Sequence, residues 1–251
     1  MRKSIICALM IGRKGSVGFP RKNFYPVLGR PLCAYPLLAA KESKQVDRIF
    51  VSTDCPDITT IARDQSAELI DRPPELANKE ALGEDAFAHG YYEIKKRLNK
   101  ENLNIELLVL LFANGATLNT GLIDKGIAIL RKDESFDSAV TTSVYNMWSP
   151  LRARKLQEDG CLHPMVPFET FGDPRSLNCD RDSQGDVHFA DMAVSVVRPQ
   201  CLENLAEGLL PQKWMGQRIA PILNWGGCDV DYEWQVPMVE FWLRKHGIQK
   251  A

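Results

Sequence analysis

The sequence predicts an α/β protein with a mainly parallel β-sheet that is covered by helices on both faces. The strongest apolar run, residues 105–112, shows none of the polar alternation of a half-exposed strand, so both of its faces should be buried. Such runs alternate with helical patterns along the chain, which is the order typical of parallel sheets. A chain of 251 residues, 45% of them hydrophobic, is also long enough to form a large core.

The expected elements follow in order along the chain. Strands are predicted at residues 4–10, 48–52, 105–112, 138–144, 192–197 and 219–224. Helices are predicted at residues 32–41, 56–65, 84–98, 122–131 and 233–246. Pro36 is expected to cause a kink or a restart of the first helix and Pro237 to interrupt the last, because proline lacks an N–H group. Thr120 is the expected cap of the helix at 122–131.

The chain is interpreted as a single domain, residues 1–251, with one insertion at residues 145–187. The insertion is rich in Pro, Gly, Asp and Arg and has poor periodicity, so it is expected to protrude rather than to form a second core. In an open parallel sheet, ligands bind where the strands end. The loops that follow Met10, Ser52, Phe112 and Val144 are therefore the places where a site is expected.

Composition excludes several classes of protein. The formal net charge of −1 lacks the basic excess of a general nucleic-acid binder. No apolar run approaches the roughly 18 residues of a membrane helix, and the first apolar run is interpreted as a strand rather than a signal peptide. The seven cysteines show no CxxC spacing, which favours reduced thiols and a cytoplasmic location without a membrane partner.

The loop at residues 12–23 carries the clearest chemical signal. Glycines at positions 12, 15 and 18 allow the backbone to turn tightly and expose its N–H groups, and Arg13, Lys14, Arg21 and Lys22 supply positive charge. Backbone donors together with cations are what a polyphosphate requires. The spacing is neither the dinucleotide fingerprint nor a Walker A loop. The alternative interpretation is a solvated basic loop.

Several ordered motifs give the chain a family resemblance. They are Gly-Ser-x-Gly-x-Pro-x-Lys-Asn at 15–23, Pro-Leu-x-Ala-Tyr at 31–35, Asp-Arg-Ile-Phe-Val-Ser-Thr-Asp at 47–54, Asp-Arg-Pro-Pro-Glu-Leu-Ala at 71–77, and Asp-Val-Asp at 229–231. The chain thereby resembles the acylneuraminate cytidylyltransferase family, which includes the pseudaminic and legionaminic acid cytidylyltransferases. The resemblance implies the Rossmann-like nucleotide-diphospho-sugar transferase fold.

The resemblance also implies a CTP site. Arg13, Ser16 and Lys22 would contact phosphates within the loop that contains Gly15, and Asn23 would face the ribose or base. Arg72 would bind the cytosine base, and the backbone of Ala81 and Gly83 would read its edge; these residues complete the predicted nucleotide site. For Arg72 alone, a surface salt bridge is the alternative.

The same resemblance implies a metal and a reaction. Asp229 and Asp231, one residue apart on an extended segment, would point to the same side and hold Mg²⁺. A sugar hydroxyl would attack the α-phosphorus of CTP and pyrophosphate would leave. Lys22 and Asp231 are the predicted catalytic residues, Asp231 also helping to remove the proton. The alternative for Asp231 is a helix cap.

The acceptor end departs from the family pattern. Relatives carry Gln-Pro-Thr-Ser-Pro-Leu where this chain has Phe-Ala-Asn-Gly-Ala-Thr-Leu at 112–118, so Asn114 and Thr117 are the available polar groups. Arg175 or Arg181 would bind the acidic group of the acceptor. A nonulosonic or related 2-keto-3-deoxy acid is the expected acceptor. The alternatives are a sugar phosphate or phosphonate, or an inactive nucleotide-binding homologue. The insertion implies a homodimer in which it covers a neighbouring site.

Overall fold

The protein is built on one central sheet. The computed structural model describes residues 2–15, 18–178, 180 and 185–250. The sheet has seven strands in the order β11-β7-β10-β6-β1-β4-β5. Its strands are β1 (Lys3–Ile11), β4 (Arg48–Thr53), β5 (Glu68–Asp71), β6 (Leu103–Phe112), β7 (Ser138–Val144), β10 (His188–Val197) and β11 (Ile219–Leu223). β10 runs antiparallel to both of its neighbours, and every other pair is parallel. The predicted mainly parallel sheet is thus confirmed.

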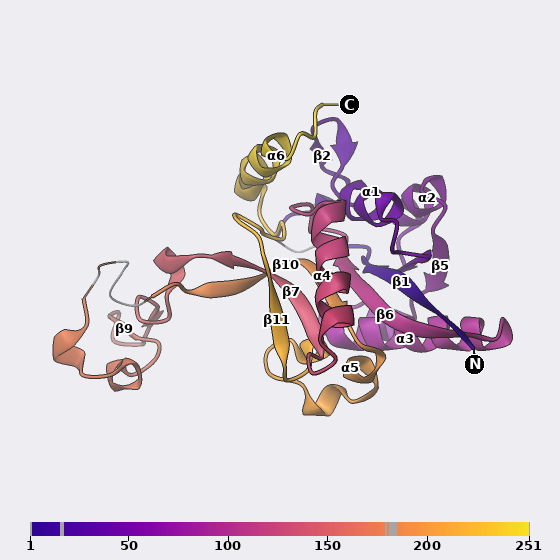
Figure 1. Ribbon diagram of the computed structural model, residues 1–251. Helices are drawn as coiled ribbons and strands as arrows, with labels where there is room; N and C mark the ends of the chain where they lie inside the picture. Colours follow the sequence, from indigo (N-terminus) through magenta and orange to yellow (C-terminus); the bar gives the residue numbers. More distant parts are fainter. Residues whose placement is uncertain (1, 16–17, 179, 181–184, 251) are drawn as a thin grey trace.

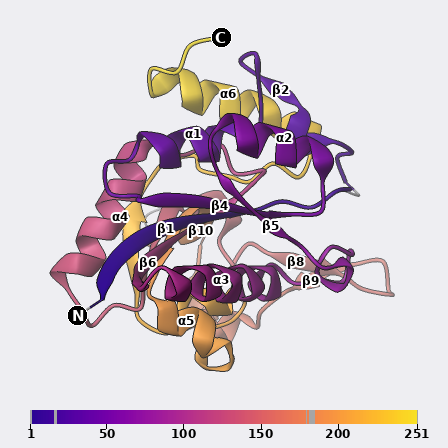
Figure 2. The same cartoon turned by 90° about the vertical axis from the view of Figure 1, so that its right-hand side faces the viewer.

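Helices cover both faces of this sheet (Figures 1 and 2). They are α1 (Ala34–Glu42), α2 (Pro56–Asp64), α3 (Gly83–Lys100), α4 (Thr120–Lys132), α5 (Pro199–Glu203) and α6 (Val236–Lys245). Alternate residues of β1 separate the two layers, since successive strand residues face opposite sides. Ile6, Ala8 and Met10 pack with α1, α2 and α4, whereas Cys7 and Leu9 pack with α3 and α5.

A third, smaller core lies beyond the edge of the α1 layer. There α6 packs on the two-stranded sheet of β2 (Pro26–Val27) and β3 (Arg30–Pro31). Val27, Leu32, Trp242 and Leu243 are fully buried in this cluster. Figure 2 shows α6 lying above α1 and beside β2. The packing brings the C-terminal part of the chain against the loop that follows β1.

Several helix boundaries differ from the sequence-based expectation. α1 begins at Ala34, so Pro36 falls in its first turn, where an N–H group is not needed, and the predicted kink is wrong. Pro237 likewise lies at the start of α6 instead of interrupting it. Asn119, not Thr120, caps α4 by accepting the N–H of Leu122 at 3.1 Å. Thr120 is instead the first helical residue.

Two strands differ as well. β10 begins at His188, four residues before the predicted start, and its pairing with β7 shifts register between Ala190 and Ser195. The apolar run from which the strand was predicted starts only within this bulge, so the residues before the run were missed. β5 was not predicted at all, because Glu68–Asp71 is a short edge strand without an apolar run.

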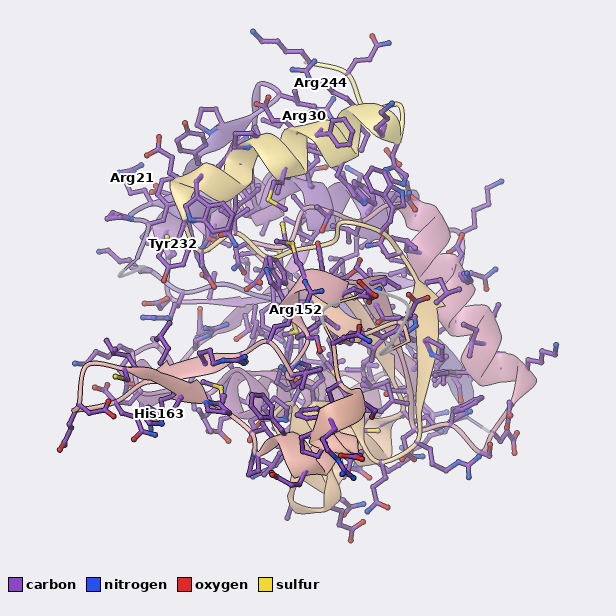
Figure 3. The ribbon with its side chains drawn as sticks, turned by 90° about the vertical axis from the view of Figure 1, so that its left-hand side faces the viewer. Arg21, Arg30, Arg152, His163, Tyr232 and Arg244 are labelled. Atoms are coloured by element: carbon purple, nitrogen blue, oxygen red, sulfur yellow. The ribbon has the colours of Figure 1, made fainter. Side chains whose placement is uncertain are left out.

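The described residues within 145–187 form an arm that extends from the sheet between β7 and β10 (Figure 1). The arm contains the two-stranded sheet of β8 (Arg154–Leu156) and β9 (Leu162–Pro164), and short 3-10 turns before and after this sheet. Figure 3 looks at the molecule from the arm side and shows Arg152 and His163 on it. The segment predicted as an insertion therefore emerges from the strand pair β7–β10.

Two expectations from composition concern reduced cysteines and the absence of a membrane helix. Cys7, Cys33, Cys55 and Cys201 are buried free thiols, whereas Cys161 is exposed. Cys179 lies outside the described residues. Across the described part of the chain, no helix is both long and apolar enough to cross a membrane.

The packing of α4 on the sheet predicts a measurable cost for one small substitution. A Cβ atom on Gly126 would lie 2.7 Å from both Ile222 Cδ1 and Val196 Cγ2. We expect Gly126→Ala to lower the free energy of unfolding by about 1–3 kcal/mol, because overpacking outweighs the gain in helix propensity. Urea unfolding measures this change. Ala128→Gly, on the exposed face of α4, serves as the propensity control and should cost about 1 kcal/mol. A more stable Gly126→Ala variant would contradict the packing argument.

Candidate active site

The loop after β1 begins with a close approach that only glycine permits. A Cβ atom on Gly12 would lie 2.7 Å from Ala113 Cβ and 2.8 Å from Ile58 Cδ1. Gly15 has a φ of +88°, in the region that other residues rarely adopt. The loop leaves the sheet at the end of β1, where Gly12 donates its N–H to the Ser52 carbonyl. The loop therefore starts at the edge of the sheet where open parallel sheets bind their ligands.

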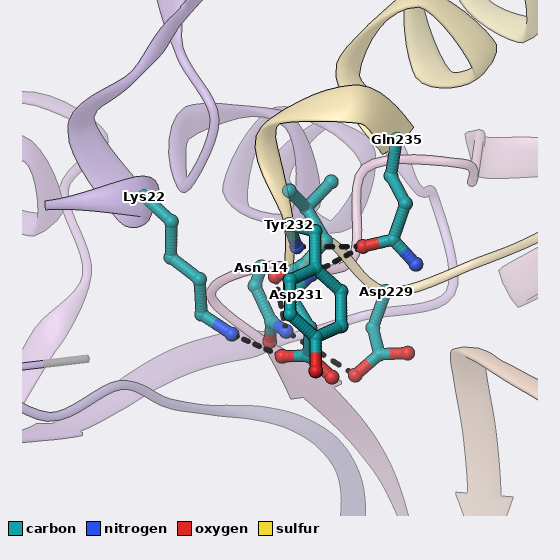
Figure 4. A network of polar contacts seen from close by, with 7 residues as sticks. Lys22, Asn114, Asp229, Asp231, Tyr232 and Gln235 are labelled. Carbon is teal, nitrogen blue, oxygen red and sulfur yellow. Dashed lines mark hydrogen bonds and ion pairs between the residues drawn. The ribbon is translucent and has the colours of Figure 1, made fainter. Parts of the chain in front are cut away.

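The far part of this loop meets the acidic segment near the C-terminus. The ammonium group of Lys22 donates to Oδ1 of Asp231 (Figure 4). A Cβ atom on Gly18 would lie 3.2 Å from the backbone oxygen of Asp231, so the two backbones pack closely. The cationic loop and the acidic pair thus lie on the same side of the molecule, as a shared nucleotide and metal site requires.

The two carboxylates of the acidic pair influence each other. Burial raises the pKa of Asp229, the charge of Asp231 raises it further, and the nearby charge of Lys22 opposes this. Oδ2 of Asp229 accepts a hydrogen bond of 3.3 Å from Asn114. The pair therefore holds more negative charge than its protein surroundings compensate.

This pair fits a hard divalent cation. No group of three or more His, Cys, Asp or Glu side chains that could hold a metal occurs in the described residues. Magnesium, however, commonly takes only one or two carboxylates and completes its shell with water and substrate phosphate oxygens. Asp229 and Asp231 supply such a donor set, and a bound cation would offset the cost of the buried Asp229 charge, whose pKa is raised first by burial and then by the charge of Asp231.

Residues of the loop after β6 hold the acidic segment in place. Gly115 forms a β-bridge with Asp229, and Val230 donates its N–H to the Asn114 carbonyl at 3.0 Å. The hydroxyl of Thr117, fully buried, donates to the Cys228 carbonyl at 3.1 Å and accepts the Cys228 N–H at 2.9 Å. Asn114 and Thr117 were predicted to contact the acceptor. Their side chains bond to the acidic segment, and the acceptor role stays a prediction.

Gln235 fixes the turn that carries Asp231, and sequence reasoning missed it. Its Oε1 accepts the N–H groups of Asp231 and Tyr232 at 2.7 and 2.8 Å (Figure 4). The 3-10 turn Glu233–Gln235 that follows is capped by Tyr232, so the alternative in which Asp231 acts as the helix cap is wrong. A glutamine four residues after an aspartate was the only available signal.

Arg72 is a buried cation at the other end of the site. It is 8% exposed, and its Nη2 donates to the Ser52 carbonyl at 2.8 Å. Burial lowers the pKa of Arg72 to about 10, opposed by the charge of Asp54 and reinforced by that of Arg13, so the side chain stays cationic at neutral pH. It makes no salt bridge with the described residues, which excludes the surface salt bridge as its role there. A buried cation that lacks a direct ion pair among the described residues is costly and indicates a ligand site.

Arg72 and Lys22 line one cavity of about 200 Å³, and the acidic pair adjoins it through the contact between Lys22 and Asp231. The predicted nucleotide residues that line it are Arg13, Gly15, Lys22, Asn23, Arg72, Ala81 and Gly83, together with Asn114 of the predicted acceptor residues. Oδ1 of Asn23 is buried and has no partner among the described residues. The N–H of Ala81 donates to Asn78 Oδ1 at 2.8 Å, which fixes the turn at the cavity rim. The cavity combines cations, an unsatisfied amide oxygen and an apolar wall.

Thr117, Asp229, Asp231 and Arg175 are predicted site residues that are not part of this lining. Ser16 and Arg181 lie outside the described residues. Arg175 lies on the arm, exposed and paired with Asp173 at 2.9 Å. Figure 3 shows Arg21 and Tyr232 on the body of the molecule, apart from Arg152 and His163. The assignment of an arm arginine to the acceptor remains a prediction.

The fold and the cavity together define an α/β protein with a cationic cavity at the carboxyl ends of its parallel strands. Residues 7–142, more than half of the chain, match the family described as cytidylyltransferase. The chain therefore belongs to the cytidylyltransferase family. This confirms the resemblance on which the sequence analysis relied.

Curated proteins to which the chain is similar carry cytidylyltransferase names. The chain is 40% identical over 85 residues, 34% of its length, to the N-acylneuraminate cytidylyltransferase of Oncorhynchus mykiss. It is 24% identical over 151 residues, 60% of its length, to a Helicobacter pylori protein named pseudaminic acid cytidylyltransferase and UDP-2,4-diacetamido-2,4,6-trideoxy-beta-L-altropyranose hydrolase. The matched segments span only 20% and 28% of these two relatives.

Solved structures share the whole fold. A CMP:2-keto-3-deoxy-manno-octonic acid synthetase complexed with CTP matches with a TM-score of 0.64 at 13% identity, covering 97% of this chain and 100% of that one. A 4-diphosphocytidyl-2C-methyl-D-erythritol synthase from Anaerococcus prevotii matches with a TM-score of 0.62 at 11% identity, covering 96% of each chain. At such identities the likeness establishes the fold alone.

The raised pKa of Asp229 predicts that removing its charge stabilises the metal-free protein. The cost of the charged form begins above the ordinary aspartate pKa of about 3.9 and is complete above the higher folded-state pKa. In EDTA at pH 7, Asp229→Asn should raise the melting temperature by about 2–4 °C, the shift that about 1 kcal/mol produces at this size. The gain should vanish as pH falls below about 4.

Differential scanning calorimetry across pH 4–8 measures this effect. Asp57→Asn is the matched control, because Asp57 is an exposed aspartate whose ion pair with Arg21, at 3.7 Å, should contribute little. An unchanged or lower melting temperature for Asp229→Asn at pH 7 would show that Asp229 carries no such electrostatic cost.

Proposed function

We propose that this chain is a Mg²⁺-dependent CTP:sugar-acid cytidylyltransferase, which joins CMP to an acidic sugar and releases pyrophosphate. The observation that carries the proposal is the contact between Lys22 and Asp231, beside Asp229, at a cavity that also contains Arg72. It places cations for a triphosphate next to carboxylates for a metal. The names of the curated relatives support cytidylyl transfer to a nonulosonic acid.

The cavity gives each end of CTP a chemically suitable partner. Arg13 and Lys22 supply positive charge for the phosphates, and the backbone of the glycine-rich loop supplies donors. Arg72, held by Ser52, offers a guanidinium to the O2 edge of cytosine. Asn23 offers its unpartnered oxygen to a ribose hydroxyl or to the N4 amino group. Backbone groups of Ala81 and Gly83 lie along the same wall and complete base recognition.

The reaction is an in-line displacement at phosphorus. The acceptor hydroxyl oxygen forms a bond to the α-phosphorus, the bond from that phosphorus to the bridging oxygen breaks, and pyrophosphate leaves with the electron pair. Lys22 stabilises charge on the phosphate oxygens, and Asp231 takes the hydroxyl proton. Asp229 and Asp231 would hold Mg²⁺, which supplies Lewis-acid stabilisation of the phosphate oxygens when bound.

A pyrophosphate-release assay tests this function. Release should require CTP, Mg²⁺ and an acidic sugar together, with a panel of nonulosonic and 2-keto-3-deoxy acids as acceptors. Lys22→Ala and Asp231→Asn should each lower kcat/KM on the order of 100-fold, because each removes charge that acts in the transition state. Asp57→Asn replaces an exposed carboxylate near the same loop and should keep kcat/KM within about twofold of the value for the unchanged protein.

Other outcomes of the assay would redirect the proposal. A preference for GTP or UTP would contradict the base assignment to Arg72. Turnover only with a phosphorylated or phosphonate acceptor would replace the acceptor class. Binding of CTP without turnover across the panel would indicate an inactive nucleotide-binding homologue.

We further propose that the protein is a homodimer assembled through the arm, residues 145–187. Apolar side chains of the arm are exposed, including Leu156 and Leu162, which are paired across β8 and β9 and are 66% and 67% exposed. Exposed apolar groups gathered on one protruding element indicate an interface. In this assembly Arg175 would serve the acceptor site of the neighbouring copy.

Light scattering at micromolar concentration tests the assembly. The unchanged protein should have twice the monomer mass, and Leu156→Asp with Leu162→Asp should reduce it to the monomer mass. Leu210→Asp, 79% exposed but outside the arm, is the matched control and should leave the dimer intact. A monomeric mass for the unchanged protein would contradict the proposal.

A further inference from the structure

A buried carboxylate that the proposed reaction does not use lies at the root of the arm. Asp191, on β10, is 4% exposed. Its Oδ2 accepts hydrogen bonds from Ser143 Oγ at 2.7 Å and Asn224 Nδ2 at 2.9 Å, and its Oδ1 accepts the Ala193 N–H at 3.2 Å. No cation forms an ion pair with it in the part of the chain that the structure describes. A buried charge held only by neutral donors is costly to keep.

The backbone is distorted where it presents this carboxylate. The register of β10 against β7 shifts between Ala190 and Ser195, and Met192 has a φ of +61°. A β-bulge of this kind re-aims a side chain, and it is often found beside functional sites. The bulge also packs against the loop after β6, since a Cβ atom on Gly115 would lie 3.1 Å from the Met192 carbonyl.

A chain of hydrogen bonds leads from Asp191 to the segment that carries Asp229. Ser143, fully buried on β7, bonds to Asp191 and accepts the N–H of Gly227 at 3.0 Å. Gly227 lies directly against the carboxylate, because a Cβ atom there would be 2.1 Å from Oδ2 of Asp191. Gly227 is two residues before Asp229, so this contact sets where the acidic segment starts.

The neighbouring amide closes the network from the other side. Asn224 Nδ2 donates both to Asp191 and to the Thr117 carbonyl at 3.3 Å. Thr117 in turn bonds both backbone groups of Cys228. The residue just before Asp229 is therefore fixed by Thr117, and the one before that by Ser143, with Asp191 joining the two supports.

From this network we propose that Asp191 and Ser143 are positioning residues, which orient the backbone that presents Asp229 to the divalent cation. The proposal rests on the proposed function, because it assumes that Asp229 is a metal ligand. Groups that orient metal ligands through hydrogen bonds typically affect metal affinity 10–100-fold. Neither residue is expected to touch the nucleotide.

Binding of Mn²⁺ in the presence of CTP, without any acceptor sugar, tests the proposal. Free Mn²⁺ is measured by electron paramagnetic resonance. Asp191→Asn, which removes the charge at nearly constant volume, and Ser143→Ala should each raise the Kd for Mn²⁺ by about 10-fold or more. The affinity for CTP in EDTA should stay within about twofold.

Ser138→Ala is the matched control. Ser138 is also fully buried on β7, and its hydroxyl bonds a backbone carbonyl, that of Met215 at 2.6 Å, at the opposite end of the strand. It should lower the melting temperature as Ser143→Ala does, yet leave the Kd for Mn²⁺ unchanged. A purely structural role for Ser143 would make the two variants alike in both measurements.

The outcomes separate the two proposals. If the unchanged protein binds no Mn²⁺ with CTP, the proposed function and this inference both fail. If it binds Mn²⁺ and the variants of Asp191 and Ser143 bind it equally well, the inference alone is overturned. Ser143→Ala keeps the test decisive if Asp191→Asn does not fold.

Discussion

The opposition of a cationic loop and an acidic segment constrains the rest of the structure. Lys22 and Asp231 are 209 residues apart in the sequence, yet they touch, because α6 packs on the small β2–β3 sheet and returns the chain to the first loop. The contact between Lys22 and Asp231 compensates only part of the positive charge of the loop and only part of the negative charge of the acidic pair. Arg72 stays buried without a counter-ion among the described residues, and the pKa of Asp229 stays raised. The molecule is therefore arranged around charges that a metal-bound triphosphate would compensate.

The sheet provides the fixed frame for these charges. β1, β4 and β6 end at one edge. The glycine-rich loop follows β1, Ser52 near the end of β4 anchors Arg72, and the loop that holds Asp229 follows β6. Antiparallel β10 ends the parallel series beside β6. The site thus lies at the carboxyl ends of the strands, where the loops that leave neighbouring strands point apart, as is general for open α/β sheets.

Sequence reasoning was most successful where a local pattern carries the information. The runs that form β1 and β6 and the loop at 12–23 could be recognised because burial and charge are written in consecutive residues. It was less successful where the decision depends on tertiary contacts. Asn119 and Thr120 are both good caps, and only the backbone geometry selects Asn119. Gln235 carries only a weak local signal, its spacing of four residues from Asp231, and Asp191 carries none, since its side-chain partners Ser143 and Asn224 are distant in the sequence. β5 is held mainly by its pairing with β4.

Tyr145, the first residue of the arm, donates its hydroxyl to the Gly227 carbonyl at 2.8 Å and stacks on Trp148. The strand pair that carries the arm outward is also the pair that contributes Ser143 and Asp191. The root of the arm and the backbone just before the acidic pair are therefore held by the same contacts. A substitution at Tyr145 or Ser143 would disturb both the direction in which the arm leaves the sheet and the position of Gly227.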